Sequence, residues 1–547
     1  MSGRAVVVAP FLVCVALYAS VMGGHFLSDD MSVIYVLSGW HDHGELWSRL
    51  FSKFSSGLDA PSHYYRPLAF LSFGLNLTMH GPNPVPWHLV NLAGHLAAGA
   101  AVYRISSALQ PESSSRFGPC FATALFLFCG TNAEAVAWIS GRYDIFATAF
   151  SIWAAALYLQ SRSGFDRFEL GALACGVLAL ASKESGAILP GLIGCLAWVK
   201  HGEAPWAARW KKIVRDLAPW LLLIAGYFAL RQAIFGSMLQ VYPGTHPLER
   251  IAEGGWLSAL KDALPWLSAA LPNKALLALA GALSALLVAA GLITAVLDRS
   301  VRRVGIGLLA AILWSLALLL PHLSGLPVSG EGGRIFYTTS ALAAVWLGIP
   351  FGVRRFAGPS AVSMRALSVL GLALLGAHAA LLHAALRDWR VAGIQMSQLV
   401  SALPGLKESM RADGYAFVFA PDAIGAAPFA RSAQGAMVLP PIQQQPLLSS
   451  MLVFVPAKLP QIPAMMRQQL IPMLKRYPLS EAIGKMNSTP AGDSASNIVW
   501  PTDVLCWRQD VGALQRLELR QTWEDANQWE RDIRDGMSHA DCGKLPQ

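Results

Sequence analysis

Residues 5–30 read AVVVAPFLVCVALYASVMGGHFLSDD, a long apolar run followed by the adjacent acids Asp29 and Asp30. The apolar part, residues 5–22, is long enough to cross a bilayer, since a transmembrane helix takes about 17–25 residues. A cleaved signal sequence is the alternative, but the length of the run and the apolar runs after it favour a retained anchor. An acidic pair at the exit of a first span can meet both an aqueous acceptor and a lipid-borne substrate, so it is the first candidate for chemistry.

The composition extends this pattern to most of the chain. The 547 residues are 54% hydrophobic and 14% charged, with a mean hydropathy of +0.44, whereas soluble domains carry about 25% charged residues. The fold class is therefore an α-helical polytopic membrane protein with about 11 transmembrane helices. These are predicted near residues 5–24, 86–108, 117–135, 143–160, 168–182, 186–199, 216–235, 274–297, 304–322, 335–352 and 366–386.

The distribution of basic residues predicts the orientation of these spans. With a cytoplasmic N-terminus the inner loops show the positive-inside bias, and the net charge of +9 faces anionic lipid, so a nucleic-acid partner is not expected. The first loop, residues 25–85, and everything after residue 386 are then outside the cytoplasm. The inner loops hold Arg116, Arg162, Arg167, Lys200, Arg209, Lys211, Lys212, Arg215, Arg299, Arg302, Arg303, Arg354, Arg355 and Arg365.

Residues 387–547 differ from the transmembrane part, residues 1–386, in composition, and predict a small extracytoplasmic α/β domain. Residues 415–420 and 451–455 are typical of strands, and residues 521–534 of a charged helix. Cys506 and Cys542 can form one disulfide if this region is extracytoplasmic. We expect a binding or lid domain over the membrane site. Separately, residues 255–271 either lie at the membrane interface or form a re-entrant segment.

Most of the notable polar residues fall on the outer side under this topology. Ionisable groups at membrane ends are costly unless they are paired or useful. Their convergence on one face of one membrane favours a functional site over separate loop charges and ion pairs. The set comprises Asp29, Asp30, Tyr65, Arg66, His88, Asn91, His95, Glu134, Arg142, Asp144, Lys183, Glu184, Glu331, Arg334 and Tyr337.

The cations and acids of this set suit transfer of a sugar from a lipid-linked phosphate. Arg and Lys near the headgroup would hold the phosphate, since a guanidinium matches its oxygens bidentately. A carboxylate would deprotonate the acceptor hydroxyl as general base. That base would be Asp29 or Asp30. The phosphate contacts would be Arg66, Arg142, Lys183 and Arg334.

Some of these residues also have plainer interpretations. The acid–cation pairs near residues 142 and 183 could be ion pairs that steady tight turns. His88, Asn91 and His95 share one helix face, where interhelical hydrogen bonds are favoured over metal ligation, because no third ligand has a familiar spacing. One acidic pair without nearby carboxylates gives little support to a divalent ion, so no cofactor is firmly implied.

The order of the motifs resembles that of the GT-C membrane glycosyltransferases. The chain is similar to the O-mannosyltransferase group that carries tetratricopeptide repeats, including an ExxRxxY segment that begins at Glu331. The motifs extend over residues 23–340, roughly 60% of the chain. They are GGxFxxDD (Gly23 to Asp30), YRPL (Tyr65 to Leu68), NPxxxHLxNxxxH (Asn83 to His95), EAVAxIxGRxD (Glu134 to Asp144) and SKE (Ser182 to Glu184).

The resemblance implies a polyprenyl- or dolichyl-phosphate sugar donor, transfer at the outer or lumenal face, and an inverting mechanism. It assigns the base to the acidic pair of the first loop and the phosphate contacts to the same four cations. Three departures stand out: Cys129 and Gly130 replace a His-Pro pair, Ser38 and Gly39 stand where an asparagine is common, and residues 387–547 lack the repeats. Because the soluble part would help to select the acceptor, mannose and a protein acceptor are not carried over.

The leading hypothesis is an inverting glycosyltransferase whose acceptor is a protein hydroxyl, a lipid or an envelope glycan. A transporter or flippase of lipid-linked saccharides is the first alternative, but it would carry charges or broken helices near the bilayer midplane, where this sequence has few. A catalytically inactive GT-C-like assembly partner is the second, against which the intact acids and cations argue. The missing repeats favour a bacterial inner membrane, with the site and C-terminal domain facing the periplasm.

Overall fold

The structure is a computed structural model, and it describes residues 3–49, 64–110, 116–162, 166–238, 273–323, 332–352, 361–410, 416–448, 450–456, 459, 503–519, 526–540 and 542. Several residues named in the sequence predictions lie outside these ranges, namely the stretch at residues 255–271, Glu331, Arg354 and Arg355.

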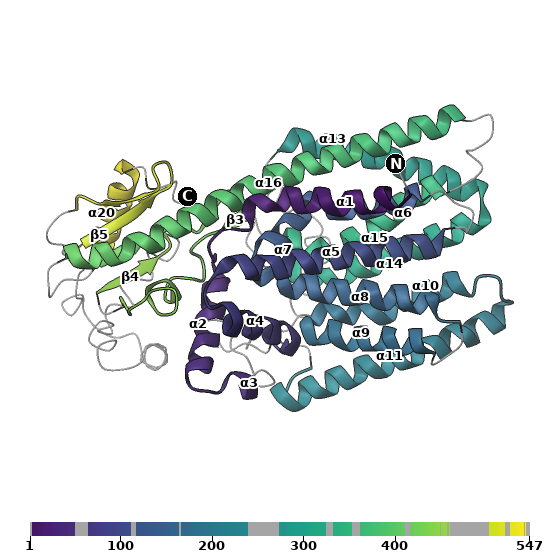
Figure 1. The fold of residues 1–547 in the computed structure, drawn as a ribbon, viewed down its shortest axis with the longest axis horizontal. Helices are drawn as coiled ribbons and strands as arrows, with labels where there is room; N and C mark the ends of the chain where they lie inside the picture. Colours follow the sequence, from purple (N-terminus) through teal and green to yellow (C-terminus); the bar gives the residue numbers. More distant parts are fainter. Residues whose placement is uncertain are drawn as a thin grey trace.

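Long helices run side by side in one bundle and make up most of the described chain (Figure 1). They are α1 (Gly3–Tyr18), α5 (Pro84–Leu109), α6 (Phe117–Leu127), α8 (Arg142–Gln160), α9 (Arg167–Ser182), α10 (Leu189–Lys200), α11 (Trp206–Phe235), α13 (Lys274–Leu297), α14 (Arg299–Leu323), α15 (Tyr337–Gly348) and α16 (Ala361–Ser409). The shorter helices α2 (Asp29–Asp42), α3 (Leu46–Arg49) and α4 (Pro67–His80) cluster at one end of the bundle, and α7 (Ala133–Ala137) follows α6.

Capping residues fix where several of these helices begin. The side chains of Asn83, Asp166 and Asn273 accept hydrogen bonds from first-turn N–H groups of α5, α9 and α13. These N–H groups have no partner within the helix, so a side-chain oxygen in front of them stabilises the start. Pro67 and Pro84 occupy the first turns of α4 and α5, where the missing N–H of proline costs nothing.

Four described helices are long and apolar enough to cross a membrane: α11, α13, α14 and α16. The pair α6 and α7, bent by 46°, would add a fifth. Many of the large apolar side chains on α11, α13 and α14 are exposed, as expected for surfaces that face lipid. The chain is thus a multi-pass membrane protein. The described helices do not confirm the predicted count of eleven, because α9, α10 and α15 have only 16, 12 and 12 residues.

Several helices of the bundle are separated by 3-10 turns, and several of the site motifs lie at these turns. These turns are η2 (Gly130–Asn132), η3 (Ile139–Gly141), η4 (Glu184–Ile188) and η5 (Gly333–Phe336). Two of the glycines are required by close backbone approach: a Cβ on Gly141 would lie 2.2 Å from the carbonyl oxygen of Ala135, and one on Gly333 2.4 Å from that of Thr131. The breaks bring charged motif residues into the bundle without placing them inside a continuous apolar helix.

Helix α16 joins the bundle to the C-terminal part of the chain. Its 49 residues span roughly 70 Å, more than twice the hydrocarbon thickness of a bilayer, which is about 30 Å. The predicted domain boundary at residues 386 and 387 therefore lies inside a continuous helix. Figure 1 shows α16 crossing from the bundle to the small sheet, at the same end as α2 and α4.

The C-terminal part is a small α/β unit. Its sheet has the order β4-β1-β5-β6, made of β4 (Met451–Phe454), β1 (Ala416–Phe419), β5 (Asp503–Arg508) and β6 (Ala513–Arg516). Only β6 is antiparallel to its neighbour. Alternate β1 residues pack in two different clusters: Phe417 and Phe419 contact helix α20 (Ala526–His539), whereas Ala416 and Val418 join the core that contains α16. The strands predicted at residues 415–420 and 451–455 and the late helix are confirmed.

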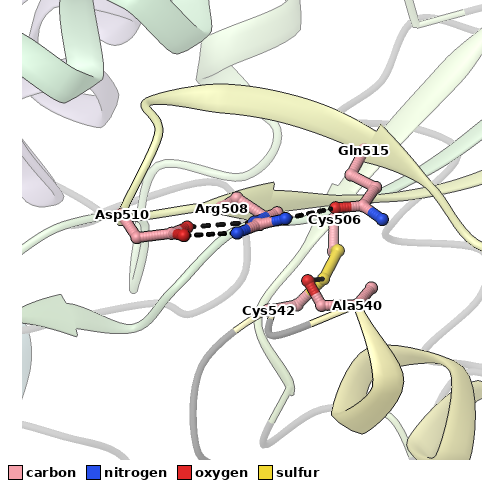
Figure 2. The surroundings of a disulfide bond; sticks show 6 residues. All are labelled: Cys506, Arg508, Asp510, Gln515, Ala540 and Cys542. Carbon is pink, nitrogen blue, oxygen red and sulfur yellow. Dashed lines mark hydrogen bonds and ion pairs between the residues drawn. A yellow bond between two sulfur atoms is a disulfide. The ribbon is translucent and has the colours of Figure 1, made fainter.

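A disulfide connects β5 to the segment after α20. Cys506 and Cys542 are paired across a sequence separation of 36 residues, with their Cα atoms 5.9 Å apart (Figure 2). This is the pairing that the sequence allowed. Both cysteines are buried in the cluster between the sheet and α20, so the bond closes that side of the C-terminal unit.

Candidate active site

The two acids of the first loop have different surroundings. Asp30 is only 2% exposed; its Oδ1 accepts hydrogen bonds from the N–H and hydroxyl of Ser140 at 2.7 and 2.6 Å, and its Oδ2 from the N–H of Leu27 at 3.2 Å. Asp29, the first residue of α2, is half-buried. Burial raises the pKa of Asp30 from 3.8 to about 7, although hydrogen bonds from Ser140 and Leu27 oppose this. Asp30 is thus held in the interior, and Asp29 is the more accessible acid.

Arg142 lies in a buried cradle of neutral acceptors. Its side chain is 0% exposed. The guanidinium donates to Asn91 Oδ1 at 2.9 Å, to Asn76 Oδ1 at 2.7 Å, to the carbonyl oxygen of Trp87 at 2.8 Å and to Ser72 Oγ at 3.2 Å. These contacts tie α4, α5 and α8 together. The predicted contact between Arg142 and a donor phosphate stays a prediction, and this environment gives it no support.

Three other cations each pair with a carboxylate. Arg66 Nη2 lies 2.8 Å from Glu184 Oε2, and Lys183 Nζ lies 2.6 Å from Asp144 Oδ1. The side chains of these cations keep 12% and 22% of their surface exposed.

The third pair closes the turn before α15. Arg334 Nε lies 3.3 Å from Glu134 Oε1, and the Arg334 side chain is 23% exposed. The other oxygen, Glu134 Oε2, accepts hydrogen bonds from the N–H groups of Gly332 and Arg334 at 2.8 and 3.2 Å. The Arg334 guanidinium also lies over the ring of Trp138, 4.2 Å from its centroid. Each of the three cations is therefore paired yet reachable.

These three cations are close enough to influence one another. Burial lowers the pKa of Lys183, Asp144 opposes this, and the positive charges of Arg66 and Arg334 lower it further. Tyr143 connects the cations to the acidic pair, because its ring lies 4.7 Å from the Arg66 guanidinium and its hydroxyl lies within electrostatic reach of Asp29 and Asp30. Cations whose like charges repel in a partly buried site favour an anionic ligand.

Two residues of this region were not predicted from the sequence. Arg231 of α11 is buried, and its Nη1 lies 3.9 Å from Glu184 Oε1, on the same carboxylate that pairs with Arg66. An arginine near the end of the apolar run 216–235 was a signal that could have found it. Ser140, which donates twice to Asp30, occupies a variable position of its motif and carried no such signal.

The polar residues of α5 make contacts between elements. His88 Nε2 lies 3.1 Å from the carbonyl oxygen of Gly24, and Asn91 donates to the carbonyl oxygens of Trp138 and Ile139. His95 Nδ1 lies 2.6 Å from the hydroxyl of Tyr337. The contact between His95 and Tyr337 joins α5 to α15, whereas His88 and Asn91 contact carbonyl groups outside the long helices. In the described ranges, no group of three or more His, Cys, Asp or Glu side chains could hold a metal ion. Tyr65, beside Arg66, is half-buried.

No protein-family model matches the chain. It is 29% identical over 188 residues to protein O-mannosyl-transferase F38B6.6 of Caenorhabditis elegans, covering 34% of this chain and 26% of the relative. It is 33% identical over 170 residues to protein O-mannosyl-transferase Tmtc1 of Drosophila melanogaster, covering 30% and 19%. For protein O-mannosyl-transferase TMTC2 of Mus musculus the identity is 30% over 185 residues, covering 31% and 21%. The chain thus spans about a fifth to a quarter of the length of these relatives.

Among solved structures, the chain is similar to ArnT from Cupriavidus metallidurans bound to undecaprenyl phosphate, with a TM-score of 0.45 and 12% identity over 82% of this chain and 86% of that one. It is also similar to the oligosaccharyltransferase of Archaeoglobus fulgidus in complex with Zn and sulfate, with a TM-score of 0.43 and 14% identity over 79% and 63%. The curated relatives confirm the resemblance to O-mannosyltransferases inferred from the motifs.

Proposed function

We propose that this chain is an inverting glycosyltransferase that moves a sugar from a polyprenyl-phosphate carrier to a hydroxyl on the extracytoplasmic side of the membrane. One observation carries the proposal: Arg66, Lys183 and Arg334 are partly exposed, and the positive charges of Arg66 and Arg334 both act on Lys183. The acid Asp29 lies close to this cluster through Tyr143. The names of the curated relatives favour a protein hydroxyl as acceptor.

The three cations would bind the donor phosphate. Each is already balanced by a carboxylate, and the buried Arg231 adds a positive charge that it shares with Glu184. A phosphate entering the cluster would meet donors from three different segments, and guanidinium groups suit its oxygens bidentately. The same donors would stabilise the phosphate as its charge grows on leaving. The buried Arg142 would support the site from behind without touching the donor.

Asp29 would act as general base. It would take the proton of the acceptor hydroxyl while that oxygen attacks the anomeric carbon of the sugar from the face opposite the phosphate. A new carbon–oxygen bond to the acceptor forms, the bond from the anomeric carbon to the phosphate oxygen breaks, and polyprenyl phosphate leaves with that electron pair. One displacement inverts the anomeric centre. Asp30 would support Asp29 through the turn of residues 27–30, which contains both acids.

The orientation of the site in the membrane belongs to the same proposal. The positive-inside distribution of Lys and Arg supports a site that faces away from the cytoplasm, together with the C-terminal part.

The test starts from the native product. Mass spectrometry of envelope proteins and glycans, with and without expression of this chain, identifies the sugar and acceptor, and the same product is then quantified for Asp29→Asn and Asp30→Asn. We expect Asp29→Asn to reduce transfer by more than about 100-fold, in the range of general-base catalysis, with unchanged expression and donor binding. Wild-type product levels in both single variants would overturn the mechanism. An unchanged envelope on loss of the chain would overturn the function itself.

A further inference from the structure

The residue before Asp29 has an unusual backbone conformation. Ser28 has φ +48° and ψ −121°, and within the described residues it is the single non-glycine with positive φ. The N–H of Asp30 donates to the carbonyl oxygen of Leu27 at 3.0 Å. This is the geometry of a type II′ turn with Ser28 at the first central position, where glycine is preferred. A serine there is strained, and such strain persists only where the surroundings impose it.

The surroundings that impose it come from the C-terminal part of the chain. The N–H of Ser28 donates to the carbonyl oxygen of Phe429 at 2.8 Å. Four residues further on, the hydroxyl of Ser32 donates to the carbonyl oxygen of Ser432 at 2.6 Å. The two hydrogen bonds stand on either side of Asp29 in sequence and join the start of α2 to residues about 400 positions away.

Residues 421–433, which we call the strap, are themselves anchored. They contain the short hairpin of β2 (Ala423–Ile424) and β3 (Ala427–Pro428). Asp388 of α16 accepts a hydrogen bond from the N–H of Ala426 at 2.9 Å, and Arg431 Nε lies 3.0 Å from both carboxylate oxygens of Asp422. Figure 1 shows this segment, at β3, between α16 and the end of the bundle that carries α2.

Helix α16 also contacts the first loop directly. A Cβ on Gly393 of α16 would lie 2.7 Å from the Cα of Gly24, and the N–H of His25 points to the carbonyl oxygen of Gly393 at 3.4 Å. The absence of a side chain at Gly393 thus allows α16 to approach the first loop closely, and α16 in turn carries the strap. Backbone contacts therefore connect the sheet-bearing part of the chain to the acidic pair.

We propose that the strap positions Asp29 by holding Ser28 in its strained conformation, so that the C-terminal part takes part in the transfer step and not only in acceptor binding. Ser28, Ser32 and Arg431 are positioning residues in this account. The inference rests on the proposed function, in which Asp29 is the general base.

Two substitutions of Ser28 test the role of the strain in the full-length protein. Ser28→Gly accepts positive φ without cost, whereas a β-branched Ser28→Val does not. We expect Ser28→Val to lower kcat by about 10–100-fold with the KM for the donor within twofold, and Ser28→Gly to keep kcat within about threefold of wild type. Equal kcat in the two variants would overturn the proposal.

A second pair of variants covers the case in which Ser28→Val does not fold. Arg431→Gln loosens the strap, and we expect a 3–10-fold loss of kcat that Ser28→Gly partly restores in the double variant, because the glycine turn needs less restraint. The matched control is Arg508→Gln, since Arg508 forms its ion pair with Asp510 in the same C-terminal part (Figure 2) but does not touch the strap in the described contacts. Arg431→Gln with the kcat of the control would overturn the proposal, as would a loss that Ser28→Gly leaves unchanged.

Asp29→Asn in the same assay separates the strap proposal from the proposed function. If Asp29→Asn is fully active, Asp29 is not the general base, and the part of the proposed function on which the strap proposal rests fails. If Asp29→Asn is inactive while Ser28→Val and Arg431→Gln match wild type, the base is retained and the strap proposal alone is wrong.

Discussion

Charged side chains near the candidate site occupy two kinds of surroundings. Asp30 and Arg142 are buried, and hydrogen bonds to neutral groups of Ser140, Asn91 and their neighbours surround them. The three ion pairs of Arg66, Lys183 and Arg334 instead join charge to charge at partly exposed positions.

The difference separates charges that hold the fold from charges that are suited to a ligand. A buried charge surrounded by neutral donors or acceptors has no partner that a ligand could displace, and losing it leaves those groups unsatisfied. A partly exposed cation beside one carboxylate can keep that carboxylate and share its remaining donors with a phosphate that approaches from its open side. The sequence motifs contain both kinds without distinguishing them.

The largest effect that would test this division is expected from Arg142→Lys. A lysine cannot reach the acceptors of Asn76, Asn91 and Trp87 together, so buried acceptors lose their donors at about 1–3 kcal/mol each. We expect a loss of roughly 3–5 kcal/mol in the free energy of unfolding, measured by denaturation in detergent. The matched control is Arg66→Lys, which keeps a charge beside Glu184 and should change stability by less than about 1 kcal/mol. Equal losses in the two variants would contradict the division.

Measurements over a range of pH test Asp30, the second of the two buried charged residues. The pKa of Asp30 is about 7 in the folded protein and about 3.9 in an unfolded chain, so the folded state binds more protons between these values. The stability contribution is complete below pH 4 and is lost as the pH rises through 7. We expect wild type to lose roughly 2–4 kcal/mol over this window relative to Asp30→Asn.

The readout is the melting temperature of both proteins in detergent between pH 4 and 8. Asp29→Asn serves as control and should keep the wild-type pH dependence, since Asp29 is the more accessible acid. Parallel curves for wild type and Asp30→Asn would mean that Asp30 is not the buried acid described above.

Local signals predicted the helices and the membrane character well, because apolar runs and their capping residues act within a few positions. The number of spans was harder to predict: the breaks at η4 and η5 lie where Glu184 and Gly333 meet other elements, and such contacts leave no periodic trace. The length of α16 was missed for a related reason, since its second half is buried by the small sheet and not by lipid.

The motifs predicted which residues belong to the site better than they predicted what each residue does there. Arg66, Lys183 and Arg334 stand in motifs and do come together, but the burial of Arg142 depends on Ser72 and Asn76 of α4, which no motif marks. The contact of Ser28 with Phe429 joins residues 401 positions apart, and no pattern within one segment can predict such a pairing.

The three paired cations provide the next test. Arg66→Lys, Lys183→Arg and Arg334→Lys should each weaken donor use by about 10-fold, since Arg and Lys present different donor geometries to a phosphate, while stability changes by less than about 1 kcal/mol because each carboxylate keeps a positive charge beside it. Transfer kinetics at varied donor concentration measure the first and melting curves the second. Arg303→Lys is the control, because Arg303 pairs with Glu203 near the start of α14 and not with a carboxylate of the candidate site. A stability loss like that of Arg142→Lys in any of the three would move that residue to the other class.

The smallest expected effect concerns the carboxylate that Arg66 shares with Arg231. Glu184 Oε2 lies 2.8 Å from Arg66 Nη2 and Glu184 Oε1 3.9 Å from Arg231 Nη1, so it competes with an incoming phosphate for both cations. Glu184→Gln keeps the hydrogen-bond acceptor and removes the charge, and we expect the KM for the donor to fall by about 2–5-fold, corresponding to about 1 kcal/mol or less. Glu203→Gln, near Arg303, should leave KM unchanged. A rise in KM for Glu184→Gln would instead mean that this carboxylate orients Arg66 for the donor, and that the ion pair belongs with the charges that hold the fold.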